Sequence, residues 1–180
     1  MTMPLINIVL WNLILGVLKM SKVFLSSDWH LGHSNVLRFR PQFSSVEEHN
    51  ETILENACLQ VSKRDVLILL GDIAFDKYWL QRIAGIKALK KILILGNHDT
   101  ERVHLSQVVS VYDQVHSLWS KRNCLISHAP VHEQELRSYK YNIHGHSHDR
   151  IVNDSRYLNV CVEQTDYKPI SWQDLMRNRE

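Results

Sequence analysis

Short apolar runs that stop abruptly at polar clusters recur along the chain. The runs are rich in Val, Ile and Leu, and each one ends at a residue of the Asp, His or Gly type. They cover residues 23–27 before Asp28, 66–70 before Gly71, 92–95 before Gly96, 124–127 before His128 and 141–144 before Gly145. Continuous apolar runs of this length are typical of strands buried on both faces. The pattern therefore predicts buried strands in these segments.

Helical segments lie between several of these runs. Ser45 and Glu48 have the spacing of a capping box, which predicts a helix from residue 45 to about residue 61. Residues 77–89 predict a second helix, in which Gly85 is a weak point, and Ser171 opens a short third one. Strands alternating with helices, followed by a strand-rich second half, indicate an α/β sandwich with mixed sheets inside and helices outside.

The polar clusters all stand at the carboxyl ends of predicted strands. Sheets of this kind bind ligands beyond those ends, so we expect the clusters to converge on one site. The glycines support this expectation. Of only six in the chain, Gly71, Gly96 and Gly145 lie inside the clusters, where tight turns or close backbone approach are needed.

Composition narrows the class of protein. A chain of 180 residues with 44% hydrophobic and 22% charged residues fits one globular domain and excludes a disordered or fibrous protein. The formal charge of +2 and the scattered Lys and Arg residues do not by themselves indicate nucleic-acid binding. Eleven histidines are an excess that points to chemistry, although three of them carry no motif and are interpreted as surface or core residues: His49, His104 and His116.

The cysteines indicate a reducing compartment. Cys58, Cys124 and Cys161 are odd in number and show no Cys-x-x-Cys spacing, which argues against a disulfide framework and a thiolate zinc site. Each stands in an apolar stretch, so we interpret all three as small buried hydrophobic residues. A cytoplasmic location follows as the expectation.

The first residues form an apolar leader. Residues 4–18 resemble a signal-peptide core or a short membrane anchor, but no positive charge precedes them and no small-residue cleavage site follows. The segment is also shorter than the roughly 20 residues of a membrane helix. Because Met20 begins an ordinary-looking start, we interpret residues 1–20 as an over-extended start or a dispensable appendage, and residues 21–180 as the catalytic domain.

The polar clusters carry a specific series of motifs. In chain order they read Asp28-x-His30, Gly71-Asp72, Gly96-Asn97-His98-Asp99, His128 and Gly145-His146-x-His148. This series resembles the signature of the calcineurin-like metallophosphoesterases, and the resemblance covers residue 21 to about residue 166. In detail the chain is similar to the small, stand-alone prokaryotic and phage members. It departs from the Ser/Thr protein phosphatases, because His98 is followed by Asp99 rather than by Glu.

The resemblance implies a sandwich of two mixed β-sheets flanked by helices, in α-β-β-α layers, and a dinuclear metal site. One metal ion would be held by Asp28, His30, Asp72 and His148, and the other by Asp72, Asn97, His128 and His146, with the Asp72 carboxylate bridging the two. Imidazole, carboxylate and amide ligands without a thiolate suit manganese, iron or zinc. We expect two divalent ions, with Mn²⁺ as the first choice.

The same resemblance implies hydrolysis of a phosphodiester by a hydroxide that bridges the two metals. His98 would donate a proton to the leaving group, and Asp99 would orient His98 and favour its protonated form. A phosphomonoesterase or nucleotide phosphatase is the alternative activity. An inactive scaffold of the same fold is a further alternative, disfavoured because every expected ligand is present. A DNA nuclease with a capping domain is disfavoured because the chain is too short for one.

The candidate substrate contacts lie in one loop. His33, Arg38 and Arg40 follow the first metal cluster, so they are candidates to hold a substrate phosphate. The alternative is a solvated loop whose Arg stems cover apolar surface. We expect a small phosphorylated substrate, with a nucleotide or a short nucleic acid as candidates, and no membrane partner.

Overall fold

The computed structural model describes residues 20–177 and residue 179. The apolar leader expected at residues 1–20 lies, apart from Met20, outside the described residues. In chain order the helices and strands are β1 (Val23–Ser26), η1 (Val36–Arg38), α2 (Val46–Gln60), β2 (Val66–Leu69), α3 (Lys77–Ala84), β3 (Lys90–Ile94), α4 (Leu105–Val109), β4 (Gln114–His116), β5 (Leu118–Lys121), β6 (Cys124–Ser127), η2 (Glu133–Ser138), β7 (Tyr141–His144), β8 (Tyr157–Asn159), η3 (Val162–Gln164), β9 (Ile170–Ser171) and α5 (Trp172–Met176).

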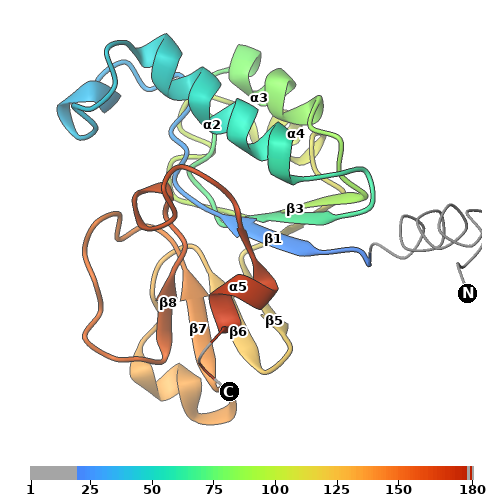
Figure 1. The fold of residues 1–180 in the computed structure, drawn as a ribbon, viewed down its shortest axis with the longest axis vertical. Helices are drawn as coiled ribbons and strands as arrows, with labels where there is room; N and C mark the ends of the chain where they lie inside the picture. Colours follow the sequence, from blue (N-terminus) through green and yellow to red (C-terminus); the bar gives the residue numbers. More distant parts are fainter. Residues whose placement is uncertain (1–19, 178, 180) are drawn as a thin grey trace, which may run out of the picture.

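Two mixed sheets form the centre of the molecule. The first has the order β4-β3-β2-β1-β9, in which β1 to β4 are parallel and β9 pairs antiparallel with β1. The second has the order β5-β6-β7-β8, in which β6, β7 and β8 are parallel and β5 is antiparallel to β6. Helices α2, α3 and α4 lie over the first sheet, on the side away from the second sheet (Figure 1). The α/β fold of two mixed sheets flanked by helices is therefore confirmed.

The helix starts follow from their caps. At α2 the Ser45 hydroxyl accepts a hydrogen bond from the Glu48 amide at 3.0 Å, as the capping-box spacing predicts. The Glu48 carboxylate accepts from the amide of Ser44 rather than from that of Ser45. At α3 the Asp76 carboxylate accepts from the Trp79 amide at 3.0 Å.

The prediction for the second helix is wrong at its C-terminal end. Helix α3 stops at Ala84 and is capped by Gly85, whereas the prediction extended it to Leu89. Ile86 turns into the core, where it is 2% exposed, and β3 already begins at Lys90. The chain needs the intervening residues to return to the sheet, so tertiary packing overrides their helical tendency.

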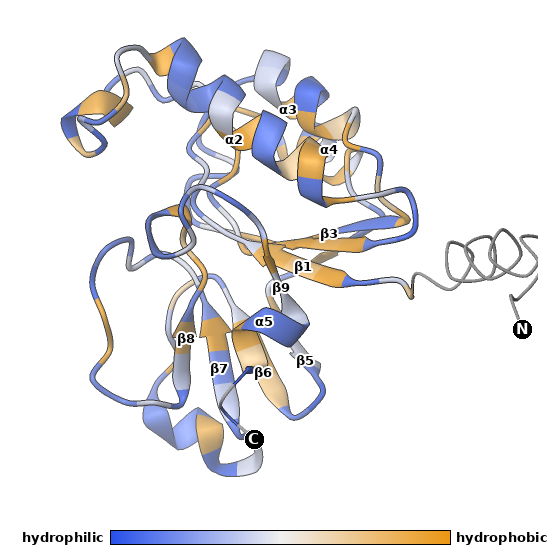
Figure 2. Cartoon of the chain, in the orientation of Figure 1, coloured by the Kyte–Doolittle hydropathy of each residue, from blue (hydrophilic) through white to orange (hydrophobic). Residues whose placement is uncertain are grey.

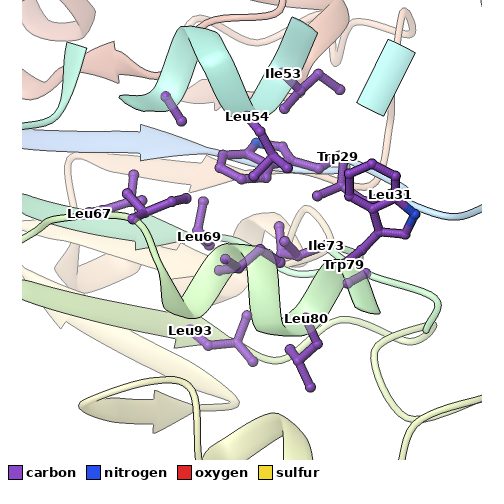
Figure 3. Packing of buried hydrophobic residues seen from close by; sticks show 14 of the residues in the cluster. Trp29, Leu31, Ile53, Leu54, Leu67, Leu69, Ile73, Trp79, Leu80 and Leu93 are labelled. Atoms are coloured by element: carbon purple, nitrogen blue, oxygen red, sulfur yellow. The ribbon is translucent and has the colours of Figure 1, made fainter. Parts of the chain in front are cut away.

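Two apolar clusters hold the layers together. One lies between the helices and the first sheet, and Figure 3 shows Trp29 and Leu31 packed there against Ile53 of α2 and Trp79 of α3. The other joins the facing sides of the two sheets and includes Ile68 of the first and Ile143 of the second. Hydrophobic residues dominate β1 and β6, whereas hydrophilic residues interrupt β7, and α2 and α3 carry both kinds (Figure 2). The carboxyl ends of the strands are thereby fixed relative to one another.

The burial of the cysteines and of His49 agrees only partly with the sequence-based expectations. Cys124 and Cys161 are buried as predicted, but Cys58 is exposed on α2, because its position on the helix faces away from the core. His49, which carries no motif, is fully buried. Within residues 20–177 and 179, every helix is too short or too polar to cross a membrane.

Candidate metal centre

The loops that follow five strands meet at one edge of the two sheets. Backbone hydrogen bonds join them directly: the Asp28 amide donates to the Gly71 carbonyl at 3.0 Å, and the His30 amide donates to the Asp72 carbonyl at 3.0 Å. The Gly145 amide donates to the His128 carbonyl at 2.7 Å. The predicted convergence of the polar clusters is therefore observed.

Asp28, His30 and His148 form the first group of possible metal ligands, with one donor atom of each lying within 4.8 Å of the others. The Asp28 Oδ1 atom lies 3.6 Å from His30 Nε2 and 3.7 Å from His148 Nε2. Within the part of the chain that the structure describes, Asp28 Oδ1 and His30 Nε2 are buried and have no hydrogen-bond partner. Such orphaned atoms are rare because they lose hydration without compensation, and a cation between them would satisfy both. The first group fits a divalent ion.

Asp72, His128 and His146 form the second group, in which one donor atom of each residue again lies within 4.8 Å of the others. The His128 Nε2 atom lies 3.3 Å from Asp72 Oδ2 and 3.0 Å from Asn97 Oδ1, so the Asn97 amide joins this group. The His128 Nδ1 atom lies 2.6 Å from the Leu70 carbonyl and donates its hydrogen there. Its Nε2 atom therefore faces the site, in the orientation that a metal-binding imidazole requires. The second group also fits a divalent ion.

The electrostatics of the site favour a bound cation. Burial alone would raise the pKa of Asp28, but the nearby His30 imidazole, the charge of His128 and a hydrogen bond from the Ser27 hydroxyl hold it well below its usual range. Burial opposes protonation of His128, but the Asp72 carboxylate raises its pKa to about 9. The carboxylates are therefore ionised, and they attract positive charge to this end of the sheets.

The backbone at the ligand positions is unusual. Positive φ angles of 59°, 50°, 56°, 64° and 49° are found at Asp28, His30, Asp72, His146 and His148, respectively. Residues with a Cβ atom adopt this left-handed region at a cost of about 1–3 kcal/mol each, and such strain clusters at functional sites. The five positions carry donor side chains where local geometry alone would favour glycine.

Two glycines allow the ligand loops to approach closely. A Cβ atom on Gly96 would lie 2.3 Å from Asp72 Oδ1, and one on Gly145 would lie 2.5 Å from Asp28 Oδ2. Both distances are far below a van der Waals contact. The glycines at these positions are therefore required for the carboxylates to occupy their places, as their location inside the clusters predicted.

His98 stands beside the two groups. Its Nε2 atom lies 4.0 Å from Asp72 Oδ2, and its ring packs against Phe75 with centroids 5.5 Å apart. Its Nδ1 atom lies 2.7 Å from Glu101 Oε1, a contact that the sequence reasoning missed. The Asp99 carboxylate instead accepts from the amides of Ile73 and Gly96. The expectation that Asp99 orients His98 is corrected, because Asp99 ties two loops together and Glu101 holds the imidazole.

The predicted substrate loop divides into three different environments. His33 lines a pocket of about 660 Å³ that also contains the ligand histidines. Burial and the neighbouring charges of His30 and Arg102 lower the pKa of His33. Arg38 is exposed and lies outside the residues that line this pocket. His33 alone of the three keeps the position expected for a phosphate contact.

Arg40 also borders the pocket, but it is 1% exposed. Its guanidinium forms five hydrogen bonds within the protein, to the carbonyls of Asp28 and Trp29, to the His49 ring, and twice to the Glu163 carboxylate. No N–H group is left for a substrate phosphate, so the expectation for Arg40 is corrected. Glu163 was missed because it lies in no motif and its partner stands 123 positions away in the sequence.

Known proteins are similar to this chain over most of its length. The chain is 28% identical over 166 residues to the uncharacterized protein MJ1445 of Methanocaldococcus jannaschii, covering 86% of this chain and 89% of that protein. It is 29% identical over 196 residues to the Gene 66 protein of Mycobacterium phage D29, covering 87% and 92%. The crystal structure of a protein of unknown function from Aquifex aeolicus, AQ665, has a similar fold, with a TM-score of 0.71, 23% identity and coverage of 86% and 97%.

The family model that matches is described as calcineurin-like phosphoesterase, and it covers residues 21–179. This span contains all the motif blocks and both groups of possible ligands. The chain belongs to the calcineurin-like phosphoesterase family.

Proposed function

We propose that the protein is a dinuclear metal-dependent phosphohydrolase that cleaves a phosphodiester. The observation that carries this proposal is the pair of adjoining donor groups at one pocket, in which Asp28 Oδ1 and His30 Nε2 are buried and have no hydrogen-bond partner among the described residues. Family membership supports a metal-dependent phosphohydrolase, and the preference for a diester is the proposed refinement.

The donor set supports two divalent ions. Asp28, His30 and His148 would hold one, and Asn97, His128 and His146 the other, with the Asp72 carboxylate shared between them. When bound, such ions activate water as a nucleophile, orient the phosphoryl group and neutralise its growing charge. The chemistry of these ligands fits Mn²⁺, Fe or Zn²⁺, of which we propose Mn²⁺.

The buried thiol of Cys161 acts as a donor. Its Sγ atom lies 3.2 Å from Asp28 Oδ2. Burial and the nearby Asp28 carboxylate raise the pKa of Cys161, so the thiol stays protonated. It therefore stabilises the Asp28 carboxylate rather than competing with it for metal. The free thiols of the chain support the proposed cytoplasmic location.

His98 is the proposed proton donor. Glu101 accepts the hydrogen of its Nδ1 atom, which leaves Nε2 facing Asp72 and the pocket. An imidazolium held in this way can deliver the Nε2 proton to the oxygen of the departing alcohol. Proton transfer by a positioned group contributes typically about 10²–10⁴-fold to a rate.

The pocket supports a substrate with an organic group beside the phosphate. Its volume of about 660 Å³ exceeds the space of a phosphate, and Arg150 lines it together with His33. Phe39 also lines it and is 77% exposed, although the three other phenylalanines are buried or partly buried. An exposed phenyl ring beside cationic groups can stack on a nucleobase. A nucleotide or a short nucleic acid is therefore the proposed substrate class.

Hydrolysis of bis(p-nitrophenyl) phosphate by protein loaded with Mn²⁺ tests the proposal. We expect turnover that chelation abolishes, and slower hydrolysis of the monoester p-nitrophenyl phosphate. The surface variant His104→Ala serves as the histidine control, since His104 caps α4 away from the pocket. Hydrolysis of the monoester alone would favour a nucleotide phosphatase. Loss of all turnover, despite bound metal, would favour the inactive scaffold.

A further inference from the structure

Arg40 and Glu163 form a buried ion pair behind the first group of ligands. Their side chains are 2% and 16% exposed, and Arg40 Nη2 lies 2.7 Å from Glu163 Oε1. Neither residue belongs to a motif block. We propose that Arg40 is a positioning residue that holds Asp28, His30 and His148 in their metal-binding arrangement, partly through Glu163. This inference rests on the proposed metal centre.

Arg40 contacts the backbone that carries two of the ligands. Its Nη2 atom donates to the Asp28 carbonyl at 2.6 Å, and its Nη1 atom donates to the Trp29 carbonyl at 3.0 Å. These carbonyls belong to the segment in which Asp28 and His30 adopt positive φ angles. A strained conformation persists only where surrounding contacts stabilise it. Arg40 supplies two such contacts between the two ligands.

Arg40 reaches the third ligand through Glu163. The Glu163 Oε1 atom accepts from Arg40 Nε at 2.9 Å and lies 2.9 Å from His148 Nδ1. A carboxylate on one ring nitrogen fixes the tautomer and the orientation of a metal-binding histidine. The other nitrogen, His148 Nε2, then faces Asp28 Oδ1 at 3.7 Å. One guanidinium thus connects two loops that are more than a hundred residues apart in the sequence.

Lysine cannot reproduce these contacts. The planar guanidinium presents donors in several fixed directions, and its remaining N–H group points to His49 Nε2 at 2.6 Å. Asn50 Oδ1 lies 2.8 Å from the opposite ring nitrogen of His49, which keeps that ring in place as an acceptor. Among the described residues, Arg40 forms hydrogen bonds with Asp28 of the first group and with no member of the second group, so its loss should affect one ion more than the other.

Titration of the metal-free protein with Mn²⁺ tests this inference. Arg40→Lys is compared with Arg82→Lys, a matched control that replaces the two-point guanidinium contact of a surface ion pair to Glu51. For Arg40→Lys we expect one Mn²⁺ to bind about 10–100-fold more weakly than in the wild type, while the second ion is retained. The electron paramagnetic resonance spectrum should change from that of a coupled pair to that of an isolated Mn²⁺ ion. Arg82→Lys should leave both sites unchanged.

Binding of each Mn²⁺ ion and the melting temperature of the metal-free protein together distinguish a positioning role of Arg40 from a general structural role. A folding defect would weaken both ions together and lower the melting temperature of the metal-free protein, and that result would overturn the inference. Unchanged binding of both ions by Arg40→Lys would also overturn it. If Arg40→Lys does not fold, Glu163→Gln decides, and it should show the same selective loss. Wild-type protein that binds no Mn²⁺ would overturn both the metal centre and this inference.

Discussion

Gly145→Ala is the sharpest steric test of the site. A Cβ atom at this position would lie 1.9 Å from Ser27 Oγ and 2.5 Å from Asp28 Oδ2. Ser27 and Asp28 are fully buried, so neither can move into solvent. Overpacking of this kind costs about 1–3 kcal/mol. For a chain of this length, each kcal/mol lowers the melting temperature by roughly 2–4 °C. We therefore expect a decrease of about 2–12 °C in the metal-free protein and weaker Mn²⁺ binding, because Asp28 must shift.

Gly85→Ala provides the matched control. At the end of α3 the nearest atom to an added Cβ is the Arg82 carbonyl oxygen at 3.3 Å, so stability should stay within about 1 kcal/mol of the wild type. Thermal unfolding monitored by circular dichroism, in the presence of a chelator, compares the two variants. Adding Ser27→Ala to Gly145→Ala removes the closest clash and should recover part of the lost stability. Equal melting temperatures for the two glycine variants would refute the steric reasoning.

Three further substitutions test the proposed roles. Asp72→Ala should lose both Mn²⁺ ions, and two retained equivalents by elemental analysis would contradict a shared carboxylate. His98→Gln should slow hydrolysis of a dinucleotide about 10²–10⁴-fold. It should slow hydrolysis of bis(p-nitrophenyl) phosphate less, because the departing nitrophenolate needs little protonation. Equal effects on the two substrates would exclude proton donation by His98. Phe39→Ala should raise KM for a dinucleotide about tenfold, the size of one stacked base, and a fall in kcat alone would count against stacking.

The strands that build the site were predictable because burial on both faces leaves an uninterrupted apolar run. Residues 66–70 and 92–95 needed no tertiary information, and both appear as central strands of the first sheet. The short strands were missed for the opposite reason. Strand β4 has no fully buried residue, and β9 is only two residues long. Such segments join a sheet through backbone pairing with a neighbour, and their side chains carry no periodic signal.

The clustering of the candidate metal ligands was predictable because each of these residues follows its own strand in a fixed type of motif. The residues that support these side chains could not be predicted from the sequence. Arg40 stands two positions after Arg38, and nothing local distinguishes the buried arginine from the exposed one. Their difference comes from Glu163, which reaches Arg40 only after folding. Similarly, Asp99 adjoins His98 in the sequence, but the turn directs its carboxylate to the amides of Ile73 and Gly96. Adjacency in sequence was a poor guide to contact.

The left-handed ligand residues show why the shape of these loops has no local signature. Side-chain propensity places Gly or Asn at positive φ, so Asp28, His30 and His148 would be assigned ordinary backbone angles from sequence alone. Their carboxylate and imidazole side chains match the donors that the proposed metal centre needs, and their backbone angles are set by contacts from elsewhere in the chain. The Gly71 carbonyl on the Asp28 amide and the Arg40 guanidinium on the Asp28 carbonyl are two of these contacts. The positions of the Asp28, His30 and His148 side chains therefore depend on contacts from residues that are distant in the sequence.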